Sequence, residues 1–344
     1  MSESNVVDAA APQAGPVPAS QPPVSDTPVS EAPASEVAAV LTGHLSLNPQ
    51  AHAAATAAIT PPPEGMQMPW LPPGHTMVLP GRGEVFYRHH QHADPTAPTL
   101  LLLHGWTASA DLQFFTAYEA LAEHFSFVAI DHRGHGRGLR SPVKFDLDDV
   151  AEDAALLIQG LGIPQVITVG YSMGGPISLL LTHAHPELVR GLVVQATALE
   201  WRAKWYERLQ WKTVHIMGPM LRSGVFPRWM RWGIRRLLGA DHSLQRYVPW
   251  LASELHRNDT FNVVQAGQSL SRYDARVFAN SLGKPAASLV TTRDRLVKPR
   301  KQRALAAALN AHVIELADDH LASWTSPEAF ATISVQLVQH VANG

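Results

Sequence analysis

The sequence contains no cysteine among its 344 residues. This absence excludes disulfide bonds, thiolate nucleophiles and cysteine-ligated zinc or iron–sulfur sites. No apolar run approaches the roughly 20 residues that span a bilayer. The first residues, Met1 to Ser4, include neither a basic nor an apolar signal region. We therefore expect a soluble, cytoplasmic protein without a transmembrane segment.

Lysine and arginine are missing from residues 1–65, which hold six acidic residues and 11 of the 27 prolines. This segment contributes a charge of −6, and the other residues contribute +4 to the net charge of −2. An acidic, alanine- and proline-rich segment cannot bury enough apolar surface to offset its ordering entropy. A disordered tail is therefore predicted over residues 1–65. The balanced total charge gives no indication of a nucleic-acid partner.

The remaining chain alternates short apolar runs with helix-like segments. A hairpin is predicted from residues 77–79 and 84–88, which flank a glycine-containing turn. Six further runs are continuously apolar, as is typical of parallel strands covered on both faces. They span residues 99–103, 125–130, 166–169, 192–196, 287–291 and 313–316. Helices are predicted between most of them, at about 109–123, 147–160, 173–184, 300–309 and 327–341. This pattern predicts an α/β fold with a doubly wound, mostly parallel sheet.

A long insertion interrupts the alternation. Residues 198–285 have helical and irregular texture without a clear strand, whereas residues 75–197 and 286–344 form the predicted core. An insertion that leaves the sheet at the end of a strand is placed to cover a site at the carboxyl edge of the sheet. We interpret it as a helical cap.

One short motif marks a candidate nucleophile. Residues 170–174 match the pattern G-x-S-x-G around Ser172, between a predicted strand and a predicted helix. A serine on such a sharp turn is forced toward positive φ, and the close backbones leave no room for a Cβ at Gly170 or Gly174. The turn would expose the Ser172 hydroxyl.

A serine hydroxyl needs a base, and the base needs an acid to fix its tautomer. His320 follows the last predicted strand, and Asp294 follows the strand before it. The chain order Ser172, Asp294, His320 is the order of enzymes with this serine turn. Glu200, past the preceding strand, remains an alternative acid.

Backbone N–H groups are expected to bind the oxyanion of an ester intermediate. The strand over residues 99–103 leads into His104-Gly105-Trp106, and a turn there would point the N–H of Trp106 into the site. Met173, which follows Ser172, would donate the second hydrogen bond.

Together these motifs resemble the α/β-hydrolase superfamily from about Met77 to Val341. Residues 103–106 resemble the oxyanion strand of that family, and residues 131–136 resemble its D-x-R-G-x-G turn. The resemblance implies a catalytic triad of Ser172, Asp294 and His320, and an oxyanion hole from Trp106 and Met173. It gives His132, Arg133 and His135 a structural role.

Three positions depart from patterns within the family. Asp319 precedes His320 where family members often have glycine. Many haloperoxidase-like perhydrolases have proline at the position of Thr107. The threonine therefore argues against perhydrolase activity. Ser172 stands where epoxide hydrolases and haloalkane dehalogenases have aspartate, which argues against an alkylated-enzyme mechanism.

The insertion combines tryptophan with positive charge. Six of the nine tryptophans lie in it, and residues 201–236 hold nine lysines or arginines and one acid, Glu207. Apolar residues from Phe226 to Leu238 recur at helical spacing, opposite several arginines. We interpret this stretch as a cap helix that packs an apolar stripe over the site, with lipid-surface contact and peripheral membrane association as the alternative. An apolar, aromatic roof over the pocket is predicted.

These features favour a serine hydrolase that cleaves a hydrophobic acyl or aromatic carboxylic ester through an acyl-enzyme. A C–C bond hydrolase, an acyltransferase or perhydrolase on the same triad, and a non-catalytic ligand-binding protein remain alternatives. No cofactor or metal is implied by this chemistry. His89, His90 and His92, just before a predicted loop, fit a solvated strand end better than a metal site.

Overall fold

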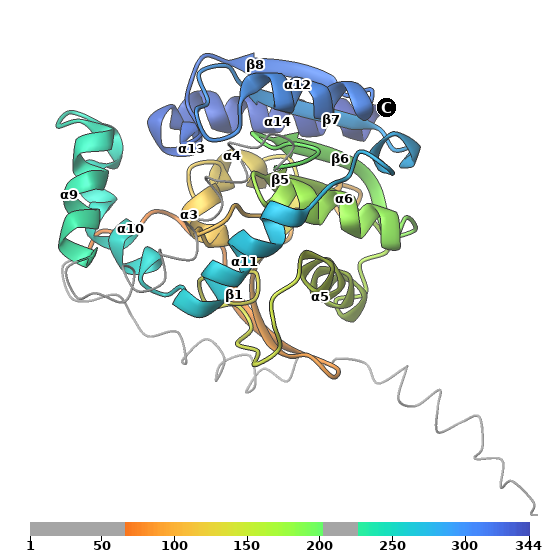
Figure 1. Ribbon diagram of the computed structural model, residues 1–344, viewed down its shortest axis with the longest axis horizontal. Helices are drawn as coiled ribbons and strands as arrows, with labels where there is room; N and C mark the ends of the chain where they lie inside the picture. Colours follow the sequence, from red (N-terminus) through yellow and green to blue (C-terminus); the bar gives the residue numbers. More distant parts are fainter. Residues whose placement is uncertain (1–65, 202–225) are drawn as a thin grey trace, which may run out of the picture. The chain divides into compact units, whose positions relative to one another are not determined.

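A computed structural model of the protein describes residues 66–201 and 226–344 (Figure 1). The tail predicted for residues 1–65 lies outside this part of the chain, as do residues 202–225 of the predicted cap. No helix within the described ranges is both long enough and apolar enough to cross a membrane.

The centre of the fold is an eight-stranded sheet in the order β1-β2-β4-β3-β5-β6-β7-β8. The strands β1 and β2 form an antiparallel hairpin, β2 pairs antiparallel with β4, and the other neighbours are parallel. In chain order the strands are β1 (Gly74–Leu79), β2 (Gly83–His90), β3 (Thr99–Leu103), β4 (Ser126–Ile130), β5 (Val166–Tyr171), β6 (Val189–Gln195), β7 (Ala286–Thr291) and β8 (His312–Leu316). The predicted doubly wound, mostly parallel sheet is confirmed.

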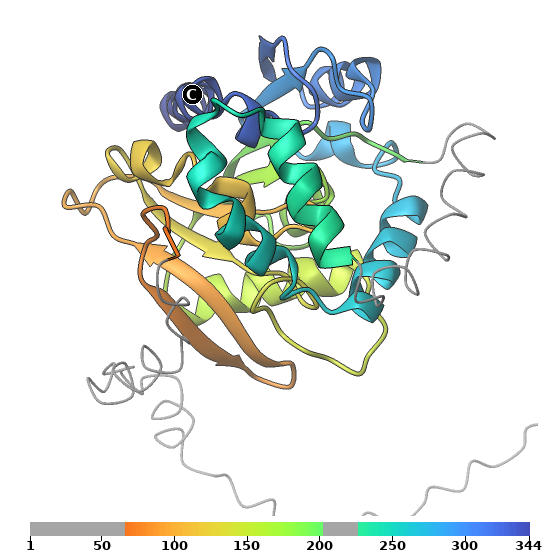
Figure 2. The ribbon, with the colours of Figure 1, turned by 90° about the vertical axis from the view of Figure 1, so that its left-hand side faces the viewer.

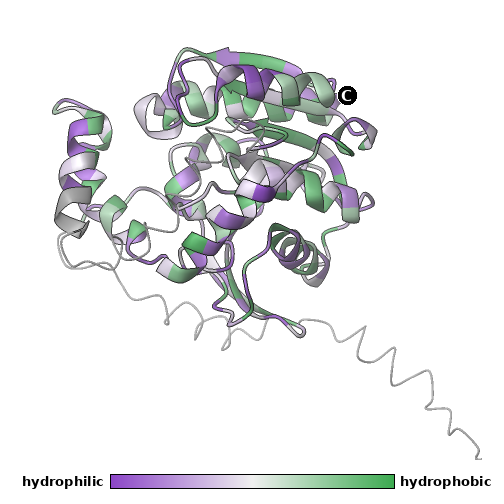
Figure 3. Ribbon diagram, in the orientation of Figure 1, coloured by the Kyte–Doolittle hydropathy of each residue, from purple (hydrophilic) through white to green (hydrophobic). Residues whose placement is uncertain are grey.

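Helices cover both faces of the sheet, so both faces of the inner strands are buried. Along β3, Leu101 and Leu103 belong to one apolar core, and Leu100 and Leu102 belong to the other. The first core includes residues of α5 (Leu147–Gly160), α6 (Gly174–Ala184) and α12 (Pro299–Ala308). The second includes residues of α3 (Ala110–Phe114), α4 (Tyr118–Ala122) and α14 (Pro327–Asn343). The inner strands are therefore hydrophobic along most of their length (Figure 3).

One local prediction was wrong, and one short helix was missed. The single helix predicted for residues 109–123 is divided into α3 and α4, and Thr116 between them donates its hydroxyl hydrogen bond to the Ser323 carbonyl at 2.9 Å. This tertiary contact lies far away in the sequence, so local periodicity could not reveal it. The short helix α13 (Ala322–Thr325), which carries Ser323, was not predicted.

The described part of the insertion is helical apart from one isolated bridge between Glu200 and Asp274. It contains α9 (Phe226–Leu238), the 3-10 helix η1 (Ser243–Tyr247), α10 (Val248–Leu255), α11 (Thr260–Arg272) and the 3-10 helix η2 (Ala279–Ser281). Figure 2 shows α9 beside α10, and the two helices are in contact. On α9, Ile234 and Leu238 are buried, whereas Trp232 is 57% exposed and Arg236 lies over its ring.

An ion pair joins the insertion to the core. Arg137, in the loop after β4, forms two hydrogen bonds of 2.7 Å with the Glu254 carboxylate on α10. Glu254 is only 1% exposed, and Arg257 adds a third hydrogen bond at 2.8 Å. Because the buried carboxylate is matched by two guanidinium groups, α10 is held against the loop that follows β4.

Candidate active site

Ser172 lies on the sharp turn between β5 and α6, with a φ of 52°. The neighbouring glycines allow this turn. A Cβ on Gly170 would come within 2.3 Å of the Gly174 carbonyl oxygen, and a Cβ on Gly174 would come within 1.9 Å of the Leu103 carbonyl oxygen. Both contacts are with backbone, which cannot move aside like the end of a flexible side chain. Only glycine fits at these two positions.

The structure brings Ser172 and His320 together. Ser172 Oγ and His320 Nε2 are 3.0 Å apart, although the residues are separated by 148 positions in the sequence. On the other side of the imidazole, Nδ1 lies 2.7 Å from Asp294 Oδ2. A carboxylate accepts, so Nδ1 donates to Asp294, and Nε2 is left to accept the Ser172 proton. A hydroxyl, an imidazole and a carboxylate thus form one hydrogen-bonded chain.

Asp294 is fixed by the loop after β7. Its Oδ1 accepts hydrogen bonds of 2.8 Å from the backbone N–H groups of Leu296 and Val297. Its Oδ2 accepts from the Thr291 hydroxyl at 2.9 Å and the Gln302 amide at 3.0 Å. The side chain is fully buried. Four donors besides His320 therefore compensate for the desolvation of this carboxylate and fix its position.

Glu200, the alternative acid, is not brought to His320. Its carboxylate pairs instead with Lys301 Nζ at 3.0 Å, on α12. The geometry therefore favours Asp294 over Glu200 as the partner of His320.

Two acidic residues shape the loop that carries His320. The Asp318 carboxylate accepts from the Thr325 hydroxyl at 2.8 Å and the Ser326 hydroxyl at 2.6 Å. The Asp319 carboxylate accepts from the backbone N–H of His320 at 2.6 Å and of Arg295 at 3.1 Å. These side-chain contacts hold the loop where family members often have glycine. The sequence departure at Asp319 is therefore compatible with the position of His320.

The residues predicted to bind an oxyanion lie near Ser172. Trp106 belongs to the turn after β3 and lines the same cavity as Ser172 and His320. Met173 directly follows Ser172 at the start of α6, and its side chain is buried in the core. The Trp106 indole donates a hydrogen bond of 2.7 Å to the Val263 carbonyl on α11. A helix of the insertion, α11, therefore fixes the orientation of the Trp106 side chain.

Three buried histidines, His104, His132 and His135, lie next to the turn that follows β3. His104 donates from Nδ1 to the Gly105 carbonyl at 2.8 Å, and its Nε2 accepts from the backbone N–H of His132 at 3.0 Å. These two contacts require a neutral imidazole. Burial, together with the nearby His135, lowers the pKa of His132 to about 3. Burial also lowers the pKa of His135 to about 4 and that of His104 well below its usual value. The cluster is therefore neutral at physiological pH.

The cavity beside Ser172 has a volume of about 180 Å³. Besides Trp106, Ser172 and His320, it is lined by Gly105, Thr107, Ala108, Leu112, Gln113, Tyr171, Leu255, Leu321, Ser323 and Trp324. The sequence analysis did not identify most of these residues. Gln113 and Ser323 lie 210 positions apart in the sequence yet form a 3.2 Å hydrogen bond. No sequence motif marks these two residues. Only the position of Gln113, near the start of the helix predicted after the strand over residues 99–103, gave a signal that it could line the site.

The aromatic side chains of the cavity come mainly from the core. Trp106 lies in the turn after β3 and Trp324 lies on α13, both outside the insertion, whereas the insertion contributes Leu255 among the lining residues. Trp201 and Trp250 are buried elsewhere, and Trp250 packs edge-on against Phe115 at 5.1 Å. The other predicted roof tryptophans are Trp205 and Trp211, outside the described residues, and Trp229 and Trp232 on α9. Within residues 66–201 and 226–344, no group of three or more His, Asp or Glu side chains is arranged to hold a metal ion.

Comparison with known proteins identifies the family to which this chain belongs. The family model described as alpha/beta hydrolase fold matches residues 98–327, which is most of the folded chain. The protein belongs to this family and is a hydrolase of the α/β-hydrolase superfamily.

Several relatives carry more specific names. A protein from Serratia proteamaculans, named as a candidate carbamate hydrolase, RutD, is 31% identical over 251 residues. That match covers 70% of this chain and 90% of the relative. A candidate esterase/lipase from Haemophilus influenzae is 36% identical over 109 residues, or 31% of this chain and 37% of the relative. The crystal structure of a hydrolase from Pseudomonas aeruginosa has a TM-score of 0.66 at 19% identity, over 77% of this chain and 98% of that chain. The last likeness shows the fold alone.

Proposed function

We propose that the protein is a serine hydrolase that cleaves a carboxylic ester through an acyl-enzyme. The observation that carries this proposal is the chain of two hydrogen bonds from Ser172 to His320 and from His320 to Asp294, 3.0 and 2.7 Å long. His320 Nε2 takes the proton as Ser172 Oγ forms a bond to the ester carbonyl carbon. The carbonyl π electrons move to oxygen and then return, expelling the alcohol, which takes the proton from His320.

Water completes the cycle. His320 removes a proton from a water molecule, the hydroxide oxygen bonds to the acyl carbon, and the acid leaves as Ser172 Oγ regains its proton. Asp294 keeps Nδ1 protonated and stabilises the imidazolium that forms twice in this cycle. Its four additional hydrogen bonds support this role, because they prevent the carboxylate from turning away.

The backbone N–H groups of Trp106 and Met173 are proposed to bind the oxyanion. Two features support the assignment: the turn of Trp106 lines the cavity, and Met173 lies at the N-terminus of the 11-residue helix α6. A helix N-terminus stabilises negative charge. Each such donor contributes about 3 kcal/mol to transition-state stabilisation in serine hydrolases.

The size of the cavity favours an ester with a short acyl group. Its volume of about 180 Å³ is below the range of roughly 300–1,000 Å³ for pockets that hold drug-sized ligands. Leu112, Leu255 and Trp324 give it apolar walls, and Gln113 and Ser323 add a polar edge. An acetyl to butyryl ester fits these dimensions better than a long acyl chain.

The insertion is proposed to act as the cap of this site. Leu255 on α10 lines the cavity, and the Val263 carbonyl on α11 holds the Trp106 indole. Both contacts support this role, because they join described helices of the insertion to the cavity beside Ser172 and to Trp106, which lines it.

Turnover of p-nitrophenyl acetate, butyrate and decanoate tests the proposal. We expect activity on the two short esters and a loss of roughly a million-fold in Ser172→Ala. Ser178→Ala is the matched control, since it removes a buried hydroxyl on α6 that has no hydrogen-bond partner among the described residues. Near-normal turnover by purified Ser172→Ala would refute the proposal.

A carbamate is the second candidate substrate, because the Serratia relative carries that name and matches over 70% of this chain. The same acyl-enzyme chemistry applies, with a carbamoyl group on Ser172. A p-nitrophenyl carbamate assayed beside the acetate separates the two: a higher kcat/KM for the carbamate would replace the ester with this second candidate.

A further inference from the structure

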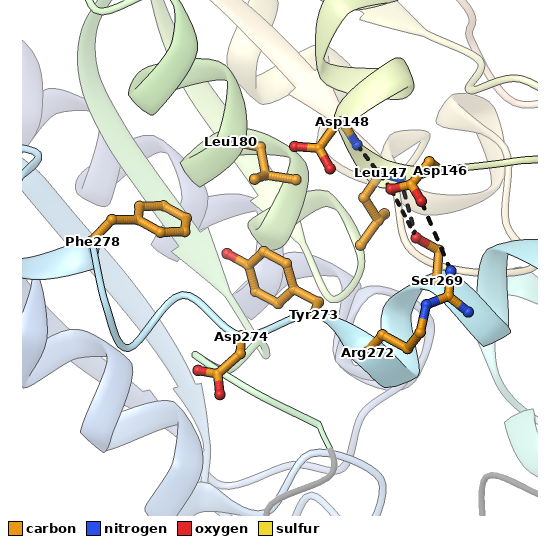
Figure 4. A pocket seen from close by; sticks show the side chains of 9 residues that line it. All are labelled: Asp146, Leu147, Asp148, Leu180, Ser269, Arg272, Tyr273, Asp274 and Phe278. Carbon is orange, nitrogen blue, oxygen red and sulfur yellow. Dashed lines mark hydrogen bonds and ion pairs between the residues drawn. The ribbon is translucent and has the colours of Figure 1, made fainter.

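The structure contains a second cleft, whose lining residues are shown in Figure 4. It has a volume of about 260 Å³ and shares no lining residue with the cavity beside Ser172. The start of α5, the middle of α6, the end of α11 and the loop after α11 enclose it. Its lining residues are Asp146, Leu147, Asp148, Leu180, Ser269, Arg272, Tyr273, Asp274 and Phe278.

The cleft carries an uncompensated negative charge. Of its three carboxylates, Asp146 lies 3.8 Å from Arg272, and Asp274 pairs with Arg276. Asp148 forms no ion pair among the described residues. Partial burial raises the pKa of Asp148, and Asp146, through its charge and a side-chain hydrogen bond, and the Asp149 carboxylate raise it further. A cation beside Asp148 would relieve this repulsion.

A buried hydroxyl faces the same space. The Tyr273 hydroxyl has no hydrogen-bond partner among the residues the structure describes, although its oxygen is buried. Figure 4 shows the ring among the lining residues, with the hydroxyl turned toward Leu180 and Phe278. Burial raises the pKa of Tyr273 well above its usual value, and Asp274 and Asp148 raise it further. The phenol is therefore neutral and can accept a hydrogen bond from a ligand. A buried polar group without a partner costs about 1–3 kcal/mol, which a bound donor would offset.

The rest of the lining is apolar and held in place. Leu147 and Leu180 supply aliphatic surface, and the Phe278 ring stacks on His183 with the ring centres 4.6 Å apart. A ligand here therefore meets an apolar wall on one side and an anionic, hydrogen-bond-accepting edge on the other. The volume is again below that of a pocket for a drug-sized molecule, so the ligand must be small.

We propose that this cleft binds a small organic cation, a primary ammonium ion on a compact apolar or aromatic body. The ammonium group would donate to the Asp148 carboxylate and the Tyr273 hydroxyl, and the apolar body would lie against Leu180 and Phe278. Neither the ester chemistry nor the residues around Ser172 take part, so this proposal does not depend on the proposed function.

Calorimetric titration of the full chain with benzylammonium chloride tests the proposal. We expect saturable binding of one equivalent, weakened at least tenfold in Asp148→Asn and clearly weakened in Tyr273→Phe. Benzyl alcohol, which has nearly the same shape without the charge, should bind at least tenfold more weakly than benzylammonium. Asp241→Asn is the matched control, because it removes an exposed carboxylate outside the cleft and should bind like the unchanged protein.

Three results would overturn the proposal. They are no saturable heat with the unchanged protein, equal affinity for benzyl alcohol, and equal affinity in Asp148→Asn. The first would mean that water alone occupies the cleft, and the last that benzylammonium binds elsewhere, such as beside Ser172. Circular dichroism establishes that each variant is folded. If Asp148→Asn does not fold, Tyr273→Phe provides an independent test.

Discussion

His320 and Asp294 are joined by a hydrogen bond of 2.7 Å between Nδ1 and Oδ2, although one follows β8 and the other follows β7. The two strands are parallel neighbours, so their carboxyl ends meet at one edge of the sheet. Ser172 reaches the same edge from β5. The sheet topology, rather than any local contact, therefore assembles the three side chains.

Replacing the acid tests its role in the proposed mechanism. Asp294→Asn keeps the shape of the side chain but no longer requires the imidazole to be protonated at Nδ1. We expect kcat for p-nitrophenyl acetate to fall about 10,000-fold. Glu200→Gln is the comparison, and its kcat should be unchanged because Glu200 pairs with Lys301. The opposite ranking of the two variants would make Glu200 the acid.

The turn at Ser172 predicts a strict size limit at Gly174. Gly174→Ala would place a Cβ 1.9 Å from the Leu103 carbonyl oxygen, which should destabilise the protein by about 3 kcal/mol. Gly233→Ala, on α9, meets no atom of the described residues within 4 Å and should leave stability unchanged or slightly raised. Urea unfolding followed by circular dichroism measures both. Equal stabilities for the two variants would contradict the described turn.

The ion pair between the core and α10 predicts that the insertion contributes to stability. Glu254→Gln leaves the Arg137 guanidinium without its main carboxylate partner, which should cost about 3 kcal/mol. Arg303→Gln breaks an exposed pair with Glu315 and should leave the unfolding temperature unchanged. Thermal unfolding compares them. A Glu254→Gln protein as stable as the Arg303→Gln protein would show that α10 is not anchored in this way.

The buried histidines predict a loss of stability in mild acid. In the unfolded chain a histidine binds a proton near pH 6.5, whereas the folded pKa values of His132 and His135 are about 3 and 4. The unfolded state therefore binds more protons as the pH falls below about 6.5, and stability is lost from there toward pH 4. Each of the two residues should cost about 2 kcal/mol at pH 5.

One neighbouring group acts in the opposite direction. Burial, together with the nearby Asp111, raises the pKa of Asp131 to about 6, so protonation of Asp131 favours the folded state as the pH falls from about 6 to 4. Asp131 is unchanged in every variant, so its contribution to the pH dependence of stability cancels when the variants are compared. His132→Leu should lose about 2 kcal/mol less than the unchanged protein between pH 7 and pH 5, and the exposed His124→Asn should behave like the unchanged protein. Urea unfolding at the two pH values decides: equal losses in all three proteins would contradict a neutral cluster.

The sequence predicted the sheet because its inner strands are continuously apolar, and β3 begins and ends at the predicted residues Thr99 and Leu103. Ser172 was identifiable because a strained turn needs glycines at fixed spacing. His320 and Asp294 were candidates because they follow strands whose ends meet. The apolar strands, the glycine spacing and the positions after strand ends are all local features of the sequence, so periodicity and spacing can predict them.

Other parts of the site depend on contacts between distant segments. Gln113 lines the cavity and forms a hydrogen bond with Ser323, 210 positions away in the sequence. Thr116, just after α3, donates a hydrogen bond to the carbonyl of the same residue. The aromatic walls come from Trp106 and Trp324 rather than from the described tryptophans of the insertion. Nothing in the local pattern distinguishes a tryptophan that lines a cavity from one packed in the core, such as Trp250.

Covalent labelling of Ser172 tests the central proposal most directly. A fluorophosphonate probe should modify the full-length protein at one site, and mass spectrometry of the tryptic peptides should place the adduct on Ser172. Prior incubation with p-nitrophenyl butyrate should slow the labelling, and His320→Ala should abolish it. Folded protein that stays unlabelled, or that carries the adduct on another residue, would contradict a nucleophilic Ser172.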